Sequence, residues 1–164
     1  MPSRPPFIVS AAEVPETRHR YPNSDEFMAP SRAIGRTAGL RQIGIHQMRL
    51  LPGTRTSWPH AESSEEEFVY VISGEVDAWI DGELHRMKAG DLAAFPSGTG
   101  ICHTFLNDGD TEALLLVGGE ADKMENRIVY PVNPSRRTDL SPERWWNDAP
   151  LRVLGPHDGR PRGR

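Results

Sequence analysis

A chain of 164 residues, 37% of them hydrophobic, is long enough for one compact domain and short for two. Its formal net charge is -4 and its charges are mixed in sign, which argues against binding of nucleic acid or of an anionic membrane. No apolar run approaches the roughly 20 residues that cross a bilayer, and the start lacks a hydrophobic signal core. With a single cysteine, Cys102, these features predict a cytoplasmic protein that binds a small molecule.

The first segment, residues 1–36, is rich in proline, arginine and serine, and its prolines prevent a long helix or a central strand. We expect an extended N-terminal arm, with a disordered leader as the alternative for its first few residues. Phe7, Ile8 and Phe27 would be costly to leave in water, so the arm should lie along the main domain or a neighbouring subunit. A homodimer is therefore the expected assembly, since a small sheet domain also leaves strand edges that need cover.

Residues 37–120 consist of short apolar runs separated by turn residues, which is typical of an all-β sandwich or barrel. Asp81-Gly82, between two such runs, predicts a two-residue hairpin turn, because that turn needs positive φ at both positions. The predicted strands are 43–51, 68–72, 75–80, 83–87, 92–95, 101–106 and 113–117. Their tight turns, with no helical period between them, predict an antiparallel closed or sandwiched sheet.

Residues 121–164 carry few apolar residues and six prolines, which indicates a C-terminal tail wrapped over the surface of the strand domain. Ser141-Pro142 predicts one short helix, with Ser141 as its cap and the proline at its first position. This helix would present Trp145 and Trp146. We expect both tryptophans to anchor the tail to the strand domain.

Four side chains of the strand domain are donors of the kinds that bind a divalent metal: His60, Glu62, Glu67 and His103. Residues two apart share a strand face, so His60 and Glu62 would point into the same cavity if their segment is extended. Glu67 and His103 each share a predicted strand face with apolar residues. A polar group on such an inner face is costly unless a cation or hydrogen bonds compensate it. A metal would supply that compensation.

The spacing of these residues resembles the two motif stretches of the cupin superfamily. The residues that correspond to the first stretch are Gly53, His60, Glu62 in place of a second histidine, Glu67 and Gly74. Those that correspond to the second are Gly90, Pro96, Gly98 or Gly100, His103 and Asn107. The resemblance covers residues 40–118 and implies an antiparallel double-stranded β-helix, a jelly-roll barrel that is commonly dimeric. It also implies a mononuclear divalent metal in the barrel mouth, such as Zn, Mn, Fe, Ni or Cu.

The glutamate at position 62 leaves two interpretations open. As a fourth ligand, Glu62 would make the centre formally neutral and a weaker Lewis acid, with a site suited to Mn, Fe or Zn. As a free side chain, it would be a general base beside a three-ligand metal. The predicted metal ligands are thus His60, Glu62, Glu67 and His103, and Glu62 is also the predicted catalytic residue.

Three functions follow from this site. The first is a metal-dependent enzyme acting on a small polar metabolite, either a dioxygenase or an isomerase, lyase or decarboxylase. The second is a non-catalytic module that binds or senses a small molecule, and the third is a structural cupin without a working site. The intact donor set argues against the third, and Glu62 as an acid or base favours the first. Cys102 is adjacent to His103 and should face the opposite way, as a core residue.

Overall fold

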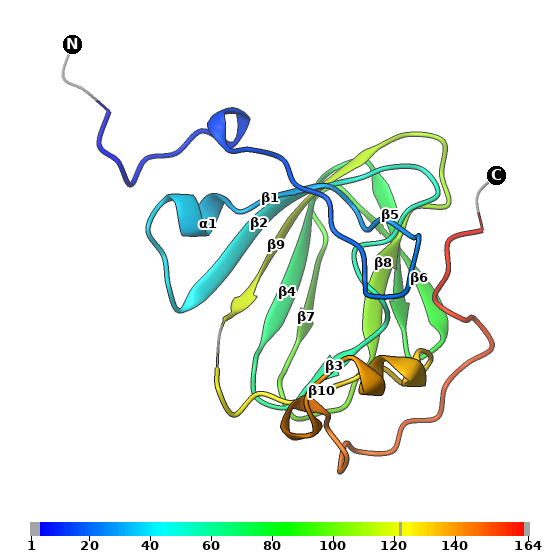
Figure 1. Ribbon diagram of the computed structural model, residues 1–164. Coiled ribbons are helices and arrows are strands. Elements are labelled where there is room, and N and C mark those ends of the chain that lie inside the picture. The colour runs from blue at the N-terminus through cyan, green and yellow to red at the C-terminus, as the bar shows by residue number, and fades with distance from the viewer. Residues whose placement is uncertain (1–3, 122, 163–164) are drawn as a thin grey trace.

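The computed structural model describes residues 4–121 and 123–162 (Figure 1). Residues 1–3, where the leader was an alternative, lie outside this range. The first strands and helix are β1 (Ser31–Arg32), α1 (Ile34–Thr37), β2 (Ile43–Leu50), β3 (Ala61–Glu62), β4 (Glu67–Ser73) and β5 (Glu75–Ile80). The later strands are β6 (Glu83–Lys88), β7 (Leu92–Phe95), β8 (His103–Leu106), β9 (Ala113–Glu120) and β10 (Ile128–Val129). Short 3-10 helices are η1 (Ala11–Glu13), η2 (Pro134–Thr138) and η3 (Pro142–Arg144).

The strands form antiparallel sheets, which confirms the predicted all-β class. A five-stranded sheet has the order β1-β2-β9-β4-β7, a three-stranded sheet the order β6-β5-β8, and β3 pairs with β10. Figure 1 shows the two larger sheets facing each other, with the β3–β10 pair near one end of the space between them. Among the described residues, no helix is long and apolar enough to span a membrane.

The core lies between the two larger sheets and follows the alternation of side chains along each strand. In β4, Val69 and Val71 are 4% and 0% exposed, whereas Tyr70 and Ile72 are 36% and 40% exposed. Core side chains contributed by both sheets include Met48, Leu50, Val69, Val71, Val76, Ala78, Phe95, Phe105 and Leu115. Because Glu67 precedes Val69 by two positions on this inner face, the strand pattern carries its carboxylate into the interior.

The predicted hairpin turn between β5 and β6 is present. Asp81 has φ 48° and Gly82 has φ 92°, and Ile80 pairs with Glu83 across the turn. Gly82 also lies under the tail, because a Cβ at this position would be 2.3 Å from the backbone nitrogen of Gly155. The glycine therefore serves both the turn and the close approach of the C-terminal segment.

Several predicted boundaries were wrong. Strand β8 begins at His103 instead of Ile101, because the Cys102 amide donates to the Asp81 carboxylate (2.9 Å) and not to a neighbouring strand. Strands β3 and β10 were not predicted; each is two residues long, and they pair Glu62 with Ile128. The predicted tail helix is a single 3-10 turn, and the side chain of Ser141 makes no capping hydrogen bond.

The tail and the arm both pack on the strand domain. Trp145 and Trp146 are 8% and 5% exposed, and Trp145 belongs to an apolar cluster with Met28 of the arm. The tip of the arm is different, since Phe7 is 70% exposed. The homodimer stays a prediction, and the exposed side chains of Tyr70, Ile72 and Leu92 on the outer sheet face add apolar surface that a second copy would cover.

One buried cation joins the three parts of the chain. The side chain of Arg55 is 1% exposed, and its Nε and Nη2 donate to the two carboxylate oxygens of Glu26 at 2.7 and 2.6 Å. Its Nη1 donates to the carbonyl of Gly159 at 2.7 Å. We therefore propose that the arm (1–36), the strand domain (37–120) and the tail (121–164) form one folding unit.

Replacing Glu26 by Ala should lower the free energy of unfolding by about 2 kcal/mol, because a buried guanidinium loses its bidentate acceptor. Urea denaturation followed by tryptophan fluorescence measures this change. Asp25→Ala is the matched control, since Asp25 is a fully exposed neighbour that pairs with Arg20 at 3.5 Å, and this change should leave stability unaltered. Equal stability of the two variants would contradict the role given to Arg55.

Candidate metal centre

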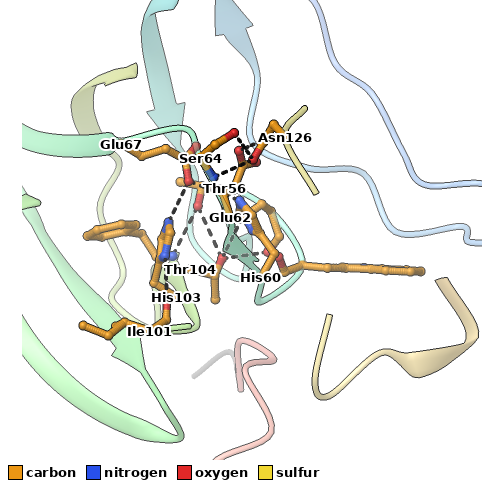
Figure 2. A network of polar contacts seen from close by, with 12 residues as sticks. Thr56, His60, Glu62, Ser64, Glu67, Ile101, His103, Thr104 and Asn126 are labelled. Atoms are coloured by element: carbon orange, nitrogen blue, oxygen red, sulfur yellow. Dashed lines mark hydrogen bonds and ion pairs between the residues drawn. The ribbon is translucent and has the colours of Figure 1, made fainter. Parts of the chain in front are cut away.

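Three of the four predicted ligands come together between the sheets (Figure 2). His60 lies just before β3, Glu67 is the first residue of β4 and His103 is the first residue of β8. One ligand atom from each lies within 4.8 Å of the other two. The two histidines are also joined through the backbone, because each amide donates to the carbonyl of the other, at 3.2 and 2.9 Å. The fold itself thus fixes their separation.

The ring nitrogens of the two histidines are oriented toward the carboxylate of Glu67. Its Oε2 is buried and lies 3.1 Å from His103 Nε2 and 3.4 Å from His60 Nε2. His60 Nδ1 lies 2.8 Å from the carbonyl of Trp58, and His103 Nδ1 lies 3.4 Å from that of Ile101. A carbonyl can only accept, so each Nδ1 carries a hydrogen, and each Nε2 that holds no proton aims its lone pair at Glu67. Such a group of acceptors needs a cation, and it fits a divalent metal.

Aromatic packing holds both rings in place. The ring of His103 stacks on that of Phe95, with centroids 3.5 Å apart and an interplanar angle of 8°. The ring of His60 lies 5.7 Å from that of Tyr130, which comes from the tail. The histidines are 8% and 5% exposed, so neither ring has room to turn away. The donors are therefore arranged before any ligand binds.

Glu62 stands beside this group and is not part of it. Its Oε2 accepts a hydrogen bond from Nδ2 of Asn126, as Figure 2 shows. It lines a space of about 10 Å³ together with Glu67 and His103, which is room for one water molecule. Glu62 as a fourth ligand, or as a free base, stays a prediction.

The two carboxylates differ in their readiness to ionise. Burial alone would raise the pKa of Glu67, but interaction with His103 and His60 lowers it well below the ordinary range. Burial and the negative charge of Glu67 raise the pKa of Glu62 to about 7, against the opposing effects of His60 and Asn126. In the metal-free protein the ionised form is thus favoured at Glu67, whereas the protonated form of Glu62 is favoured relative to an exposed glutamate.

The pKa values of the two histidines are also shifted in opposite directions. Burial alone would lower the pKa of His60, but Glu67 and then Glu62 raise it to about 9. Burial lowers the pKa of His103, and the charge of His60 adds to this effect. In the metal-free protein, a proton on His60 therefore compensates the negative charge of the Glu67 carboxylate. A proton and a metal ion would compete for the same position.

A second space lies on the inner side of the three donors. It has a volume of about 90 Å³, and its lining combines the three donors with Met48, Thr56, Ser57, Val69, Phe105 and Val117. Most of these additional side chains are apolar. The candidate centre thus adjoins two spaces, a small acidic opening lined by Glu62, Glu65 and Glu67 and a mainly apolar chamber.

Two predicted structural residues behave as expected. Cys102 is fully buried on the opposite face of its segment, where it packs with Trp79 and Leu106. The amide of Asn107 donates to the carbonyls of Leu50 and Thr111, at 2.7 and 2.8 Å. Asn107 therefore fastens the turn that follows β8.

Two groups at the site were not predicted from the sequence. The carbonyl of Trp58 orients His60, and any residue type could supply a carbonyl. Asn126 is 2% exposed and contacts Glu62, although its segment has the composition of a surface loop. Neither group belongs to a motif, so only the three-dimensional structure identifies them.

Comparison with known proteins defines the class to which this fold and site belong. Residues 46–118 match the model of the cupin domain family. The chain is 32% identical to protein SchB of Streptomyces halstedii over 109 residues, which are 66% of this chain and 73% of that protein. It is also 32% identical to polyketide synthase CurC of Streptomyces cyaneus over 111 residues, which are 68% of this chain and 67% of that protein. The chain therefore belongs to the cupin family.

A solved structure supports the same assignment. The crystal structure of a cupin-superfamily sugar phosphate isomerase from Silicibacter pomeroyi superposes with a TM-score of 0.69 at 30% identity. The alignment covers 75% of this chain and 80% of that one. The similarity thus extends beyond the stretch that matches the family model.

Replacing His103 by Ala should weaken Zn²⁺ binding by about 100-fold or more, since it removes a donor from a three-donor site. Isothermal titration of the metal-free protein with Zn²⁺ measures the affinity. His85→Ala is the control, because His85 is an exposed histidine on β6, outside the site. A similar loss in both variants would place the metal elsewhere.

Zn²⁺ affinity should rise with pH. Because the pKa of His60 is raised to about 9, this ring holds a proton at lower pH, and the metal must displace it. We expect the affinity to increase about tenfold per pH unit between roughly pH 7 and 9. The pKa of Glu62 is about 7, so a second proton is released near pH 6 if Glu62 binds the metal. Titrations in two buffers of different ionisation enthalpy count these protons, and a pH-independent affinity would contradict the arrangement.

Proposed function

We propose that this protein is a metal-dependent enzyme that moves a proton next to the carbonyl group of a small, uncharged metabolite. One observation carries the proposal: the buried Oε2 of an ionised Glu67 faces the Nε2 atoms of His60 and His103. A second carboxylate, Glu62, stands at the same opening with a very different pKa.

His60, Glu67 and His103 would hold the metal. Two imidazole nitrogens and one carboxylate oxygen suit Zn, Mn, Fe or Ni. When bound, a divalent ion would polarise a carbonyl oxygen and increase the acidity of the neighbouring C–H bonds. The charge of Glu67 offsets one of its two positive charges, so the centre stays electrophilic.

Glu62 would carry the proton. Burial and the charge of Glu67 raise its pKa to about 7 in the metal-free protein, toward the range that suits general acid–base catalysis. Asn126 engages Oε2, which leaves Oε1 to take a proton from the substrate and to return it at another atom. The same carboxyl group thereby serves in both directions of a proton shift.

The surroundings of the site favour an unphosphorylated substrate. Among the described residues that line the two spaces, none is a lysine or an arginine, and Glu62 and Glu65 flank the opening. A phosphate group would find no cation there besides the metal. The mainly apolar chamber has a volume of about 90 Å³, so the group that enters it is small and largely apolar.

The names of the similar proteins agree with this reaction class. One is a polyketide synthase and another a sugar phosphate isomerase. Polyketides and sugars both carry carbonyl groups next to C–H bonds, so proton transfer beside a carbonyl is chemistry that they share. The described residues that line the two spaces include no lysine or arginine, so this site lacks the side chains that would bind the phosphate group of a sugar phosphate.

The test is deuterium exchange next to the carbonyl. Zn²⁺-loaded protein is incubated in D₂O with small unphosphorylated ketones and hydroxyketones and with a sugar phosphate, and proton NMR follows the loss of signal. We expect exchange in the unphosphorylated compounds. Glu62→Gln should lower its rate by about 100-fold or more, because the base is lost, while Zn²⁺ stays bound.

Glu65→Gln is the matched control, since Glu65 lines the same opening but accepts from the backbone amide of Lys123 at 2.7 Å. Its exchange rate should stay within a few-fold of the original. Metal-loaded protein that binds these compounds without exchange would replace the enzyme by the alternative, a binding module. Loss of Zn²⁺ from Glu62→Gln would instead identify Glu62 as the fourth ligand.

A further inference from the structure

The side chain of Asn126 has a fixed orientation toward Glu62. It is 2% exposed and lies in the segment between β9 and β10. Its Oδ1 accepts from the backbone amide of Ser64 at 3.1 Å and lies 3.4 Å from the hydroxyls of Ser63 and Ser64. A backbone amide can only donate, so the oxygen of Asn126 must face Ser64. Its Nδ2 is therefore the atom that faces Glu62 (Figure 2).

The backbone on either side of this contact is held independently of the side chain. Strand β10 pairs with β3, and in this pairing Glu62 of β3 is opposite Ile128 of β10. Arg127 and Ser63 exchange two further hydrogen bonds, from the Arg127 amide to the Ser63 hydroxyl at 2.7 Å and from the Ser63 amide to the Arg127 carbonyl at 2.9 Å. A change of the Asn126 side chain should thus leave the path of the chain intact.

We propose that Asn126 is a positioning residue, which holds one oxygen of Glu62 so that the other oxygen faces the metal centre. In the described part of the chain, Asn126 is the residue with a side-chain hydrogen bond to the Glu62 carboxylate. The inference rests on the proposed function, because Glu62 is the group that it positions. It assigns a role to the C-terminal segment, outside residues 46–118 that match the cupin domain.

The physical reason is charge. Glu62 and Glu67 line the same small opening, and the negative charge of Glu67 repels an ionised Glu62. The last torsion of a glutamate side chain has a broad energy minimum, so an unrestrained carboxylate would turn away from its neighbour. A hydrogen bond from the Asn126 amide opposes that rotation and favours one orientation.

Asn126→Asp is the most selective variant, since it keeps an oxygen that can accept from Ser64 and replaces the donor by a second acceptor. Asn126→Leu removes the donor at similar size without adding charge. Ser64→Ala is the control, because it deletes one contact of Asn126 Oδ1 and leaves the donor to Glu62 in place. Thermal unfolding shows that each variant is folded before it is tested.

The first measurement needs no turnover. Each protein is loaded with Co²⁺ alone, and its visible absorption reports the arrangement of groups around the ion. We expect Asn126→Asp and Asn126→Leu to change the spectrum as Glu62→Gln does, and Ser64→Ala to leave it unchanged. In a background of Glu62→Gln, the Asn126 variants should have no further effect, because the group that they position is gone.

The second measurement is the deuterium exchange assay. Both Asn126 variants should lower the exchange rate by about 10- to 100-fold while the Co²⁺ or Zn²⁺ content is unchanged. A purely structural Asn126 would alter the unfolding temperature and leave spectrum and rate as they were, which would overturn the proposal. If no protein catalyses exchange, the proposed function fails, and the Co²⁺ spectra still decide whether Asn126 orients Glu62.

Discussion

The site depends on a buried carboxylate oxygen that faces two imidazole nitrogens. Glu67 is placed there by the alternation of β4, which turns it inward together with Val69 and Val71. Its Oε2 is buried without a hydrogen-bond partner among the described residues, so it requires a cation, whether a proton on His60 or a metal ion. The pairing of the sheets brings these groups together, and the cation requirement explains why an otherwise apolar interior tolerates them.

The local environment gives two chemically identical side chains different pKa values. Glu62 and Glu67 are five residues apart in the sequence and share one opening, yet their pKa values are shifted in opposite directions. Interaction with two histidines keeps Glu67 ionised, whereas burial and the charge of Glu67 favour the protonated form of Glu62. Two carboxylates whose pKa values differ in this way suit two different roles, one as a metal ligand and the other as a proton carrier.

Local patterns predicted much of the fold, and long-range contacts account for the rest. The alternation in β4, the Asp81-Gly82 turn and the hydrogen bonds of Asn107 within the turn after β8 are set by neighbours in the sequence, and the structure has all three. The position of Glu62 was not predictable in this way. It depends on Asn126, which is 64 residues away, and on two strands of two residues each, too short to show a periodic pattern.

The buried polar side chains of the strand domain set a lower limit on the length of chain that can fold. Residues 46–118 match the cupin domain, but Arg55 and Trp79 find their partners outside that stretch. The indole of Trp79 donates to the carbonyl of His157 at 2.7 Å, and this residue follows the matched stretch. Arg55 binds Glu26, which precedes it. An expression fragment trimmed to the matched residues would retain His60, Glu67 and His103 and lose the acceptors of two buried donors. A fragment confined to residues 46–118 should therefore be less stable than the full chain.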